Sequence, residues 1–167
     1  SDSTGWAIIT IDPTTQAKCI KRFALIKVPS GWKLMRRLYF MAAELARVLQ
    51  NNPEIQAVGI ELPMGVKNTQ TTLTLGKVSG AISFALKQIK PFMPIRTYMP
   101  GAWRKFFLGF EPKSDKFDLK ETVWGIAHET YPEISIPLSE NDVTDAIGIG
   151  TALLNEHGLK GLNYMLN

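Results

Sequence analysis

The order of apolar segments along the chain is the feature that most restricts its fold. Residues 5–11 (GWAIITI) are apolar on both faces, which is typical of a strand buried within a sheet. A turn at 12–16, with Pro13 after Asp12, separates them from a partly alternating strand over 17–28, so the two strands form a hairpin. Helical and strand patterns then alternate to the end of the chain. This order predicts a mixed α/β domain.

The later elements follow from periodicity and turn signals. A helix is expected from Ser30, a plausible N-cap, to the stop signal at 51–53. Its apolar stripe is interpreted as core rather than as a cofactor-contacting surface, and consists of Met35, Leu38, Ala42, Leu45 and Leu49. Strands are expected over 55–61 and 94–99, helices over 69–89, 100–107, 116–131 and about 141–156, and a short tail after that. Because the 167 residues contain no repeat or linker, we expect one domain over 1–167.

Composition and charge narrow the class of protein. The only cysteine, Cys19, excludes an internal disulfide and fits a reducing compartment, and no apolar run is long enough to span a bilayer. The segment 87–120 contains eight basic and three acidic residues and carries a charge of +5, whereas the whole chain carries +4. A localised positive zone suggests a polyanionic partner. A solvated surface is the alternative, and charge alone does not decide between them.

Three carboxylates occupy positions that favour metal binding. Glu61 ends a buried strand, where a parallel strand delivers a side chain to the functional edge of its sheet. Asp142 and Asp145 lie three residues apart and therefore on one face of the last helix, whose next residues, AIGIG, are small enough to lie flat against a sheet. Paired acids disfavour each other's ionisation unless a cation lies between them. An N-cap role for Asp142 and a surface position for Glu61 are the alternatives, but together with the positive zone the three acids favour Mg²⁺.

Several segments resemble the RuvC-type Holliday junction resolvases, or crossover junction endodeoxyribonucleases, in a form similar to phage-encoded members. They are AVGIELPMGVKN with LTLGKVSGAI, GFEPKSDKFDLKETV and ENDVTDAIGIG, and the order of elements matches as well. The resemblance implies an RNase H-like fold with a mixed five-stranded sheet, made of an antiparallel hairpin plus parallel strands and flanked by helices. It also implies a Mg²⁺-dependent, structure-selective endonuclease that resolves four-way and other branched DNA by paired phosphodiester hydrolysis. We expect Mn²⁺ to substitute, a homodimer as the working form, and the cytoplasm of a bacterial or phage-infected cell as its location.

The resemblance assigns catalytic roles to individual residues. Glu61, Asp142 and Asp145 match the metal-binding acids, and Lys116 falls where the family places a lysine near the scissile phosphate. Lys116 lies three residues before Leu119 on the apolar side of its expected helix, and a cation there could neutralise charge on the transferring phosphate. Lys113 is the competing choice, but the residue three positions later is Lys116, which breaks the apolar pattern.

Further residues are expected to contact DNA or to form a dimer interface. Met64 lies where some relatives carry an aromatic that wedges into the junction. The DNA-contacting set is Met64, Lys67, Asn68, Arg104, Lys105 and Lys113. The interface is expected on the helix at 69–89, where small residues let backbones approach closely, and comprises Gly76, Gly80, Ala81 and Phe84, with Leu75, Val78 and Ile82 adding apolar area. The alternative is that this small-residue face packs only on the chain's own sheet.

The first element of the family pattern departs from this sequence. The family begins with a strand ending in an aspartate, seven residues before the glycine that matches Gly5, a position upstream of Ser1. Asp2 is too close to Gly5, and choosing Asp12 leaves one strand too few before the first helix. We therefore expect the first strand and its aspartate upstream of Ser1. If they are absent, the alternative is a catalytically incomplete branched-DNA-binding module of the same fold. A nucleotide phosphotransferase is disfavoured, because no glycine-rich phosphate loop is present.

Overall fold

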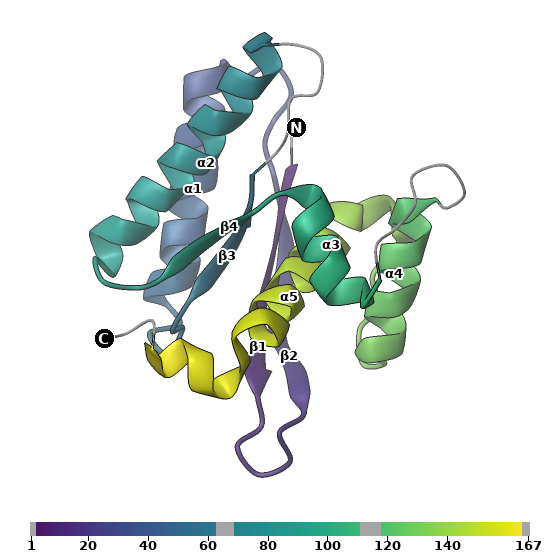
Figure 1. Cartoon of the computed structure of the whole chain (residues 1–167). Coiled ribbons are helices and arrows are strands. Elements are labelled where there is room, and N and C mark those ends of the chain that lie inside the picture. The colour runs from purple at the N-terminus through teal and green to yellow at the C-terminus, as the bar shows by residue number, and fades with distance from the viewer. Residues whose placement is uncertain (1–2, 63–68, 111–117, 165–167) are drawn as a thin grey trace. The chain divides into compact units, whose positions relative to one another are not determined.

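The computed structural model describes residues 3–62, 69–110 and 118–164, with side chains described over 3–62, 73–74, 76–110 and 118–156. A hairpin precedes alternating helices and strands (Figure 1), which confirms the predicted α/β class. The strands are β1 (Ser3–Ile11), β2 (Lys18–Lys27), β3 (Val58–Glu61) and β4 (Ile95–Tyr98). The helices are α1 (Leu34–Gln50), α2 (Thr69–Ile89), α3 (Pro100–Leu108), α4 (Leu119–Thr130) and α5 (Asn141–Tyr164), the last preceded by a 3₁₀ turn, Leu138–Glu140.

Contacts gather the chain into two compact units. The hairpin unit contains Ser3–Ile26 and Gly101–Glu156, and therefore β1, most of β2, α3 except Pro100, α4, and α5 as far as Glu156. The α1–α2 unit contains Lys27–Pro100 together with residues from 157 onward. Among the described residues the strands form two two-stranded sheets, β1–β2 and β3–β4. The single five-stranded sheet and the single domain over 1–167 therefore stay predictions.

The turn of the hairpin is built around Asp12. Its carboxylate oxygen accepts hydrogen bonds from the main-chain N–H groups of Thr14, at 2.8 Å, and Thr15, at 2.7 Å. These bonds, with that from Thr15 the stronger, hold the pKa of Asp12 below its usual value because they favour the charged form. Asp12 therefore stabilises a turn by bonding to its own backbone, as this residue type commonly does.

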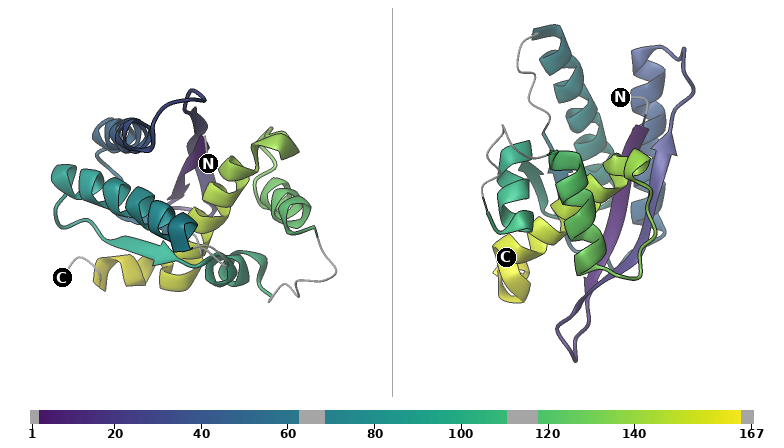
Figure 2. Two further views of the ribbon diagram at one scale, coloured as in Figure 1. Left: turned by 90° about the horizontal axis from the view of Figure 1, so that it is seen from above. Right: turned by 90° about the vertical axis from the view of Figure 1, so that its right-hand side faces the viewer.

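In the hairpin unit, α5 lies against β1 at van der Waals distance (Figure 2). A Cβ added at Gly5 of β1 would lie 2.0 Å from the carbonyl oxygen of Asp142, so no other residue fits there. Further along α5, a Cβ at Gly148 would lie 2.5 Å from the ring of Trp103, and one at Gly150 would lie 2.9 Å from Ile9. The prediction that the small residues after Asp145 let this helix lie flat is confirmed.

The α1–α2 unit combines a helix pair with a parallel strand pair. Strands β3 and β4 run parallel, in a register from Val58 opposite Ile95 to Glu61 opposite Tyr98. Helices α1 and α2 pack on each other (Figures 1 and 2). The core of this unit is apolar and consists of Ala42, Leu49, Ile82, Leu86 and Met93. The buried part of the predicted α1 stripe is therefore core, as expected.

The beginning of α1 differs from the prediction. The helix begins after Lys33, which has no side-chain cap, so Ser30 is not the N-cap. Instead, Trp32 donates a main-chain hydrogen bond to Pro29 at 3.4 Å, and Gly31, with a φ of 90°, closes this turn. Met35 was assigned to the core but is 71% exposed, because only the later residues of the stripe reach the buried side.

Two other helix boundaries also differ. Helix α4 begins at Leu119 rather than at 116, because the carboxylate of Asp118 accepts hydrogen bonds from the N–H groups of Lys120 and Glu121 and so caps it. Helix α5 continues through the expected tail as far as Tyr164. The glycines in this tail weaken a helix but do not forbid one, so the boundary cannot be placed from them alone.

Candidate metal-binding and DNA-binding site

The two aspartates of α5 lie near the beginning of the helix, within the hairpin unit. Because α5 begins at Asn141, Asp142 lies in the first turn of the helix and is not its N-cap. Both aspartates are half-buried, whereas Val143 and Thr144 between them are fully buried and anchor the turn. Residues three apart share a helical face, so the two carboxylates lie on one side of α5. The helix dipole favours negative charge at this end.

Strand β1 positions the first of these aspartates. The hydroxyl group of Ser3 donates a hydrogen bond to the Oδ2 atom of Asp142. Two residues further along, Gly5 touches the main chain of Asp142 itself. Both contacts orient the Asp142 carboxylate relative to the strand. The role of Ser3 was missed, because it acts on a residue 139 positions away and no local pattern marks it.

Glu61 lies at the carboxyl end of β3, as predicted. The pairing with β4 continues past Glu61, since Leu62 donates to the carbonyl of Tyr98 at 2.7 Å. In a parallel pair, this end of both strands is where ligands commonly bind. Glu61 belongs to the α1–α2 unit, and the two aspartates belong to the hairpin unit. Within the described parts of the chain, no group of three or more His, Cys, Asp or Glu side chains could hold a metal ion. The three-carboxylate site therefore stays a prediction.

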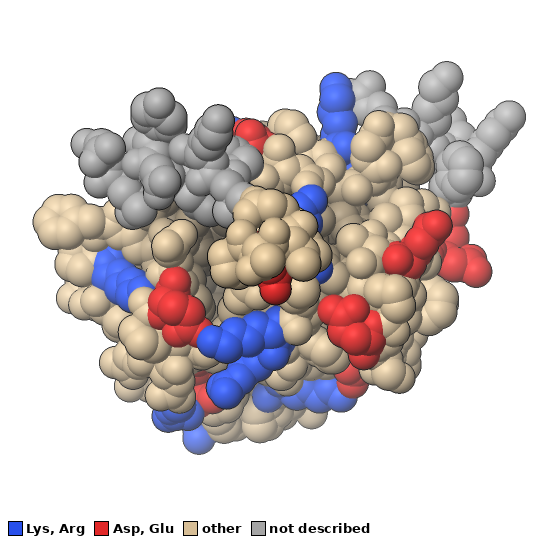
Figure 3. All heavy atoms as spheres, turned by 90° about the horizontal axis from the view of Figure 1, so that it is seen from below, with Lys and Arg blue, Asp and Glu red and all other residues tan. Residues whose placement is uncertain are grey.

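The positive zone at 87–120 is divided between the two units, and two of its lysines form hydrogen bonds within the fold. The ammonium group of Lys87 donates to the carbonyls of Pro91 and Met93, at 2.9 and 2.7 Å. That of Lys90 donates to the carbonyls of Pro53 and Ile55, the latter at 2.7 Å. These lysines hold turns in the α1–α2 unit. On the face drawn in Figure 3, lysine and arginine are interspersed with aspartate and glutamate.

The remaining predicted DNA contacts are only partly described. Arg104 is half-buried on α3, with its guanidinium carbon 5.0 Å from the ring centroid of Trp103, and Lys105 beside it is exposed. Because Trp103 contacts Gly148, this part of α3 packs on α5 in the hairpin unit. The other assigned residues lie outside the described part of the chain: Met64, Lys67, Asn68, Lys113 and Lys116.

The small-residue face of α2 is open. No described atom of the chain lies within 4 Å of a Cβ added at Gly76 or Gly80. Phe84, on the same face, is 68% exposed, whereas Ala81 is half-buried. Ile82 was expected to add area to this face but is buried in the core of the unit. The alternative was that this face packs on the chain's own sheet. Among the described residues, none packs against Gly76 or Gly80.

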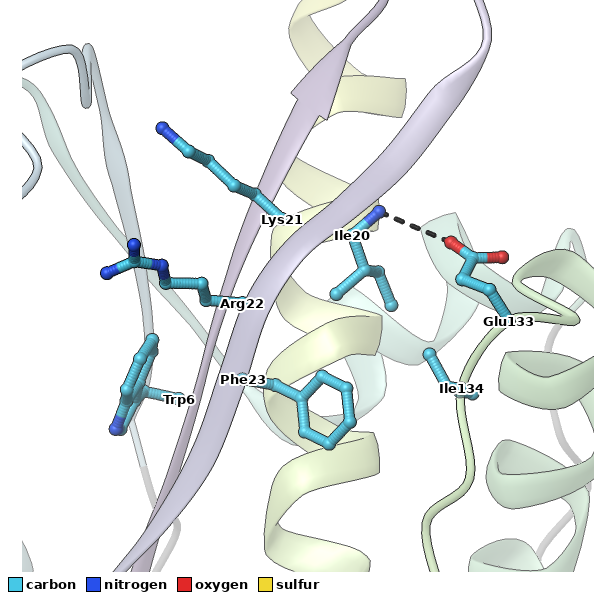
Figure 4. Close-up of a pocket in the computed structure, with 7 residues that line it drawn as sticks. All are labelled: Trp6, Ile20, Lys21, Arg22, Phe23, Glu133 and Ile134. Atoms are coloured by element: carbon cyan, nitrogen blue, oxygen red, sulfur yellow. Dashed lines mark hydrogen bonds between the residues drawn. The ribbon is translucent and has the colours of Figure 1, made fainter.

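A pocket of about 380 Å³ lies on the hairpin unit, apart from every residue assigned above (Figure 4). It is lined by Trp6, Ile20, Lys21, Arg22, Phe23, Glu133 and Ile134. The main-chain N–H of Ile20 donates to the carboxylate of Glu133 at 3.5 Å, which ties β2 to the segment after α4. None of these residues carries a function-associated pattern in the sequence. The pocket is a surface feature of the hairpin.

Similarity to known proteins extends over nearly the whole chain. The crossover junction endodeoxyribonuclease RuvC of Zymomonas mobilis is 26% identical over 156 residues, which cover 93% of this chain and 86% of that protein. The Thermus thermophilus RuvC structure has a TM-score of 0.73 at 15% identity and covers 96% of this chain and 92% of its own. T. thermophilus RuvC in complex with a Holliday junction substrate has a TM-score of 0.72 at 15% identity, covering 96% and 89%. The resemblance to RuvC is confirmed.

The likeness to RuvC is one of both sequence and fold. It gives this chain an RNase H-like α/β fold, since both superpositions cover nearly all of each chain. No family model matches the chain. The similarity to phage-encoded members stays a prediction, because these similar RuvC proteins come from Z. mobilis and T. thermophilus. Among the described helices, none has the length and apolar character needed to cross a membrane.

Proposed function

We propose that this protein is a metal-dependent endodeoxyribonuclease that cuts four-way and other branched DNA. The observation that carries the proposal is the likeness to RuvC over 93% of the chain, with an acidic pair held in the first turns of α5. A RuvC structure in complex with a Holliday junction supports branched DNA as the substrate class. We expect it to act in the cytoplasm of a bacterial or phage-infected cell, where such DNA arises.

The metal ligands we propose are Glu61, Asp142 and Asp145. Their carboxylate oxygens are the hard donors that Mg²⁺ prefers, and Mn²⁺ accepts the same donors. The two aspartates share one helical face, and the Ser3 hydroxyl holds one of them. Two carboxylates leave most of an octahedral shell to be filled, so Glu61 completes the site in this proposal. When bound, divalent ions supply an activated water and stabilise the leaving oxygen.

The proposed role of Lys116 is to neutralise charge on the scissile phosphate, and that of the remaining basic residues is to hold the DNA backbone. Backbone contacts give affinity and orientation rather than sequence specificity. Lys105 is supported by its exposure and the half-buried Arg104 by its place beside it on α3, which packs on α5 in the unit that carries the aspartates. Met64, Lys67, Asn68 and Lys113 rest on the sequence resemblance alone.

A homodimer is the proposed assembly. A four-way junction has approximate two-fold symmetry, and a two-fold dimer presents two identical active sites that match paired cuts. The open face of α2 supports this, because Gly76 and Gly80 lie beside two exposed apolar side chains, Leu73 at 55% and Phe84 at 68%. Residues 73, 76, 80 and 84 recur at helical spacing and form one stripe. A second copy of the chain could cover this stripe.

Replacement of one proposed ligand tests the nuclease. Asp145→Asn removes a negative charge while keeping the size of the side chain, so cleavage of a four-way junction in Mg²⁺ should fall about 100-fold or more. Junction binding in EDTA should stay near wild type, because affinity comes mainly from phosphate contacts. Calorimetric titration with Mn²⁺ should show weaker metal binding by the variant, which gives a readout that does not depend on activity.

Asp118→Asn is the matched control. It is the same substitution at the N-cap of α4, and asparagine caps a helix about as well as aspartate. Its cleavage should equal that of the wild type. Retention of more than a few per cent of cleavage by Asp145→Asn would refute the metal assignment. A wild-type protein that binds junctions tightly but never cuts them would instead identify a DNA-binding module.

A further inference from the structure

The beginning of α1 exposes aromatic and basic side chains with no acidic residue among them. From Lys27 to residue 43 the chain contains four cations, Lys27, Lys33, Arg36 and Arg37, and no aspartate or glutamate. The first turn of the helix likewise has no acid. Two large side chains are strongly exposed, Met35 at 71% and Tyr39 at 77%. All of these residues belong to the α1–α2 unit.

Three side chains in this region form a cluster centred on Trp32. The guanidinium carbon of Arg36 lies 3.9 Å from the ring centroid of Trp32. Phe40 meets the same indole edge-on, with centroids 5.5 Å apart and planes at 88°. The turn closed by Gly31 places Trp32 ahead of the helix, and the spacing of four residues aligns Arg36 and Phe40 with it. The guanidinium group of Arg36 therefore rests against the indole ring of Trp32 before any ligand arrives.

Tyr39 and Met35 lie beside this cluster on the same side of the helix. Tyr39 follows Arg36 by three residues and Met35 by four, the spacings at which helical side chains are neighbours. The opposite side of α1 is buried, including Leu38, Met41 and Ala42. The exposed phenol and thioether therefore make no contribution to the core of the unit. They present flat or adaptable apolar surface next to cations.

We propose that this α1 surface, defined by Trp32, Lys33, Met35, Arg36 and Tyr39, binds single-stranded nucleic acid. Lys33 and Arg36 attract a polyanion from a stretch of sequence that contains no acid, and Tyr39 and the Arg36 guanidinium offer planar groups on which bases stack. Base faces are covered in a duplex, so stacking of this kind selects unpaired nucleotides. An acidic peptide would use the cations but would offer no base face on which the planar groups could stack. The proposal does not depend on the metal site.

Fluorescence anisotropy with labelled dT20 in EDTA tests the proposal on the full chain. The wild type should bind dT20 more tightly than a 20-base-pair duplex. Tyr39→Ala should weaken dT20 binding by roughly 5- to 100-fold, the range expected for loss of one stacked base. Arg36→Lys keeps the charge but loses the planar group, so affinity should fall while the dependence on salt is unchanged. A parallel titration with rU20 distinguishes RNA from DNA as the source of the strand.

Two matched controls come from the same unit. Phe92→Ala removes an aromatic side chain that is 92% exposed, at the turn before β4. Arg47→Ala removes a cation from the last turn of α1, where it pairs with Glu44. Both should bind dT20 as the wild type does. Circular dichroism spectra matching the wild type establish that each variant is folded.

Three results would overturn the proposal. The first is unchanged dT20 affinity in folded Tyr39→Ala and Arg36→Lys. The second is an equal loss of duplex and dT20 binding, which would make this surface a plain contact with the duplex backbone. The third is a change in molecular mass by light scattering in Met35→Ala or Tyr39→Ala, which would make it an interface between protein chains.

Discussion

Helix α2 carries two glycines and the part of α5 up to Glu156 carries two as well, and the chain uses these pairs in opposite ways. On α5, a Cβ at Gly148 or Gly150 would meet another side chain at 2.5 or 2.9 Å. On α2, a Cβ at Gly76 or Gly80 would meet no described atom within 4 Å. The same kind of sequence signal therefore marks a packed face in one helix and an open face in the other. Small residues in a sequence therefore do not show by themselves whether a helical face is packed or open.

The energetic consequence differs between the two helices. Glycine inside a helix costs about 1 kcal/mol relative to alanine. On α5 this cost is offset, because the absent side chains let the helix approach β1 and α3 and thereby position its aspartates. On α2 nothing in the described chain offsets it. A second copy of the chain would provide that compensation, which is why the comparison bears on the proposed dimer.

The largest effect is expected where β1 meets α5. Gly5→Ala places a Cβ 2.0 Å from a main-chain carbonyl oxygen, which cannot move without displacing the first turn of α5. We expect the free energy of unfolding to fall by about 3 kcal/mol or more, since overpacking against backbone is poorly relieved. Thermal unfolding would show this as a midpoint lowered by roughly 6 °C or more.

Gly101→Ala is the control for that change. Gly101 lies in α3, where an added Cβ meets no atom of the described residues within 4 Å, so the unfolding midpoint should stay constant or rise slightly. Junction cleavage by Gly5→Ala should also fall, because the displaced turn carries Asp142. A Gly5→Ala protein as stable and active as the wild type would contradict the close approach of β1 to α5.

Patterns that depend on local spacing were predictable from the sequence, and contacts between distant segments were not. The hairpin turn at Asp12, helix α2 over residues 69–89, and the position of Glu61 at a strand end follow from turn residues, periodicity and apolar runs. The bond from Ser3 to Asp142 joins segments 139 residues apart and has no local signature. Met35 satisfied the helical spacing of a core residue, yet the buried stripe of α1 does not extend to the first turn.

The next largest effect is expected at Gly148, in the packed part of α5. Gly148→Ala places a Cβ 2.5 Å from the fully buried ring of Trp103, which has no free space into which to turn. We expect a loss of about 1–3 kcal/mol in unfolding free energy by urea denaturation. Gly150→Ala is the matched change. Its added Cβ meets only the end of the flexible Ile9 side chain, so the loss of unfolding free energy should be smaller. Equal effects of the two substitutions would show that Trp103 gives way as readily as Ile9, so that α5 is held no more tightly on α3 than on β1.

A buried hydrogen bond adds a polar anchor to α5. The hydroxyl groups of Tyr131 and Thr151 lie 2.7 Å apart, and Thr151 also donates to the carbonyl of Ile147 at 2.8 Å. Thr151→Val leaves the buried tyrosine hydroxyl without this partner, so unfolding free energy should fall by about 1–2 kcal/mol. A loss below about 0.3 kcal/mol would mean that another group takes up the hydroxyl.

Burial raises the pKa of Tyr131, although the bond to Thr151 acts in the opposite direction. The folded protein therefore holds the phenol proton more tightly than the unfolded chain does. The corresponding stability is complete below the ordinary pKa of 10.0 and is lost as the pH rises towards the higher folded value. Stability measured across alkaline pH should decline less steeply in Tyr131→Phe than in the wild type.

The smallest effect on stability, and the one that decides the comparison, is expected at Gly80. In a monomer, Gly80→Ala adds a methyl group to an open helical face and should raise unfolding free energy by about 0.5–1 kcal/mol. If a second copy packs closely on α2, the larger Gly80→Leu side chain should instead shift the protein towards monomer in light scattering. The same variant should lose paired cutting of the two junction strands. Gly125→Ala is the control: it lies on α4, where an added Cβ meets no described atom within 4 Å, and so it shows the effect of helix propensity alone. A folded Gly80→Leu dimer that still makes paired cuts would remove α2 from the interface and leave its glycines without a structural reason.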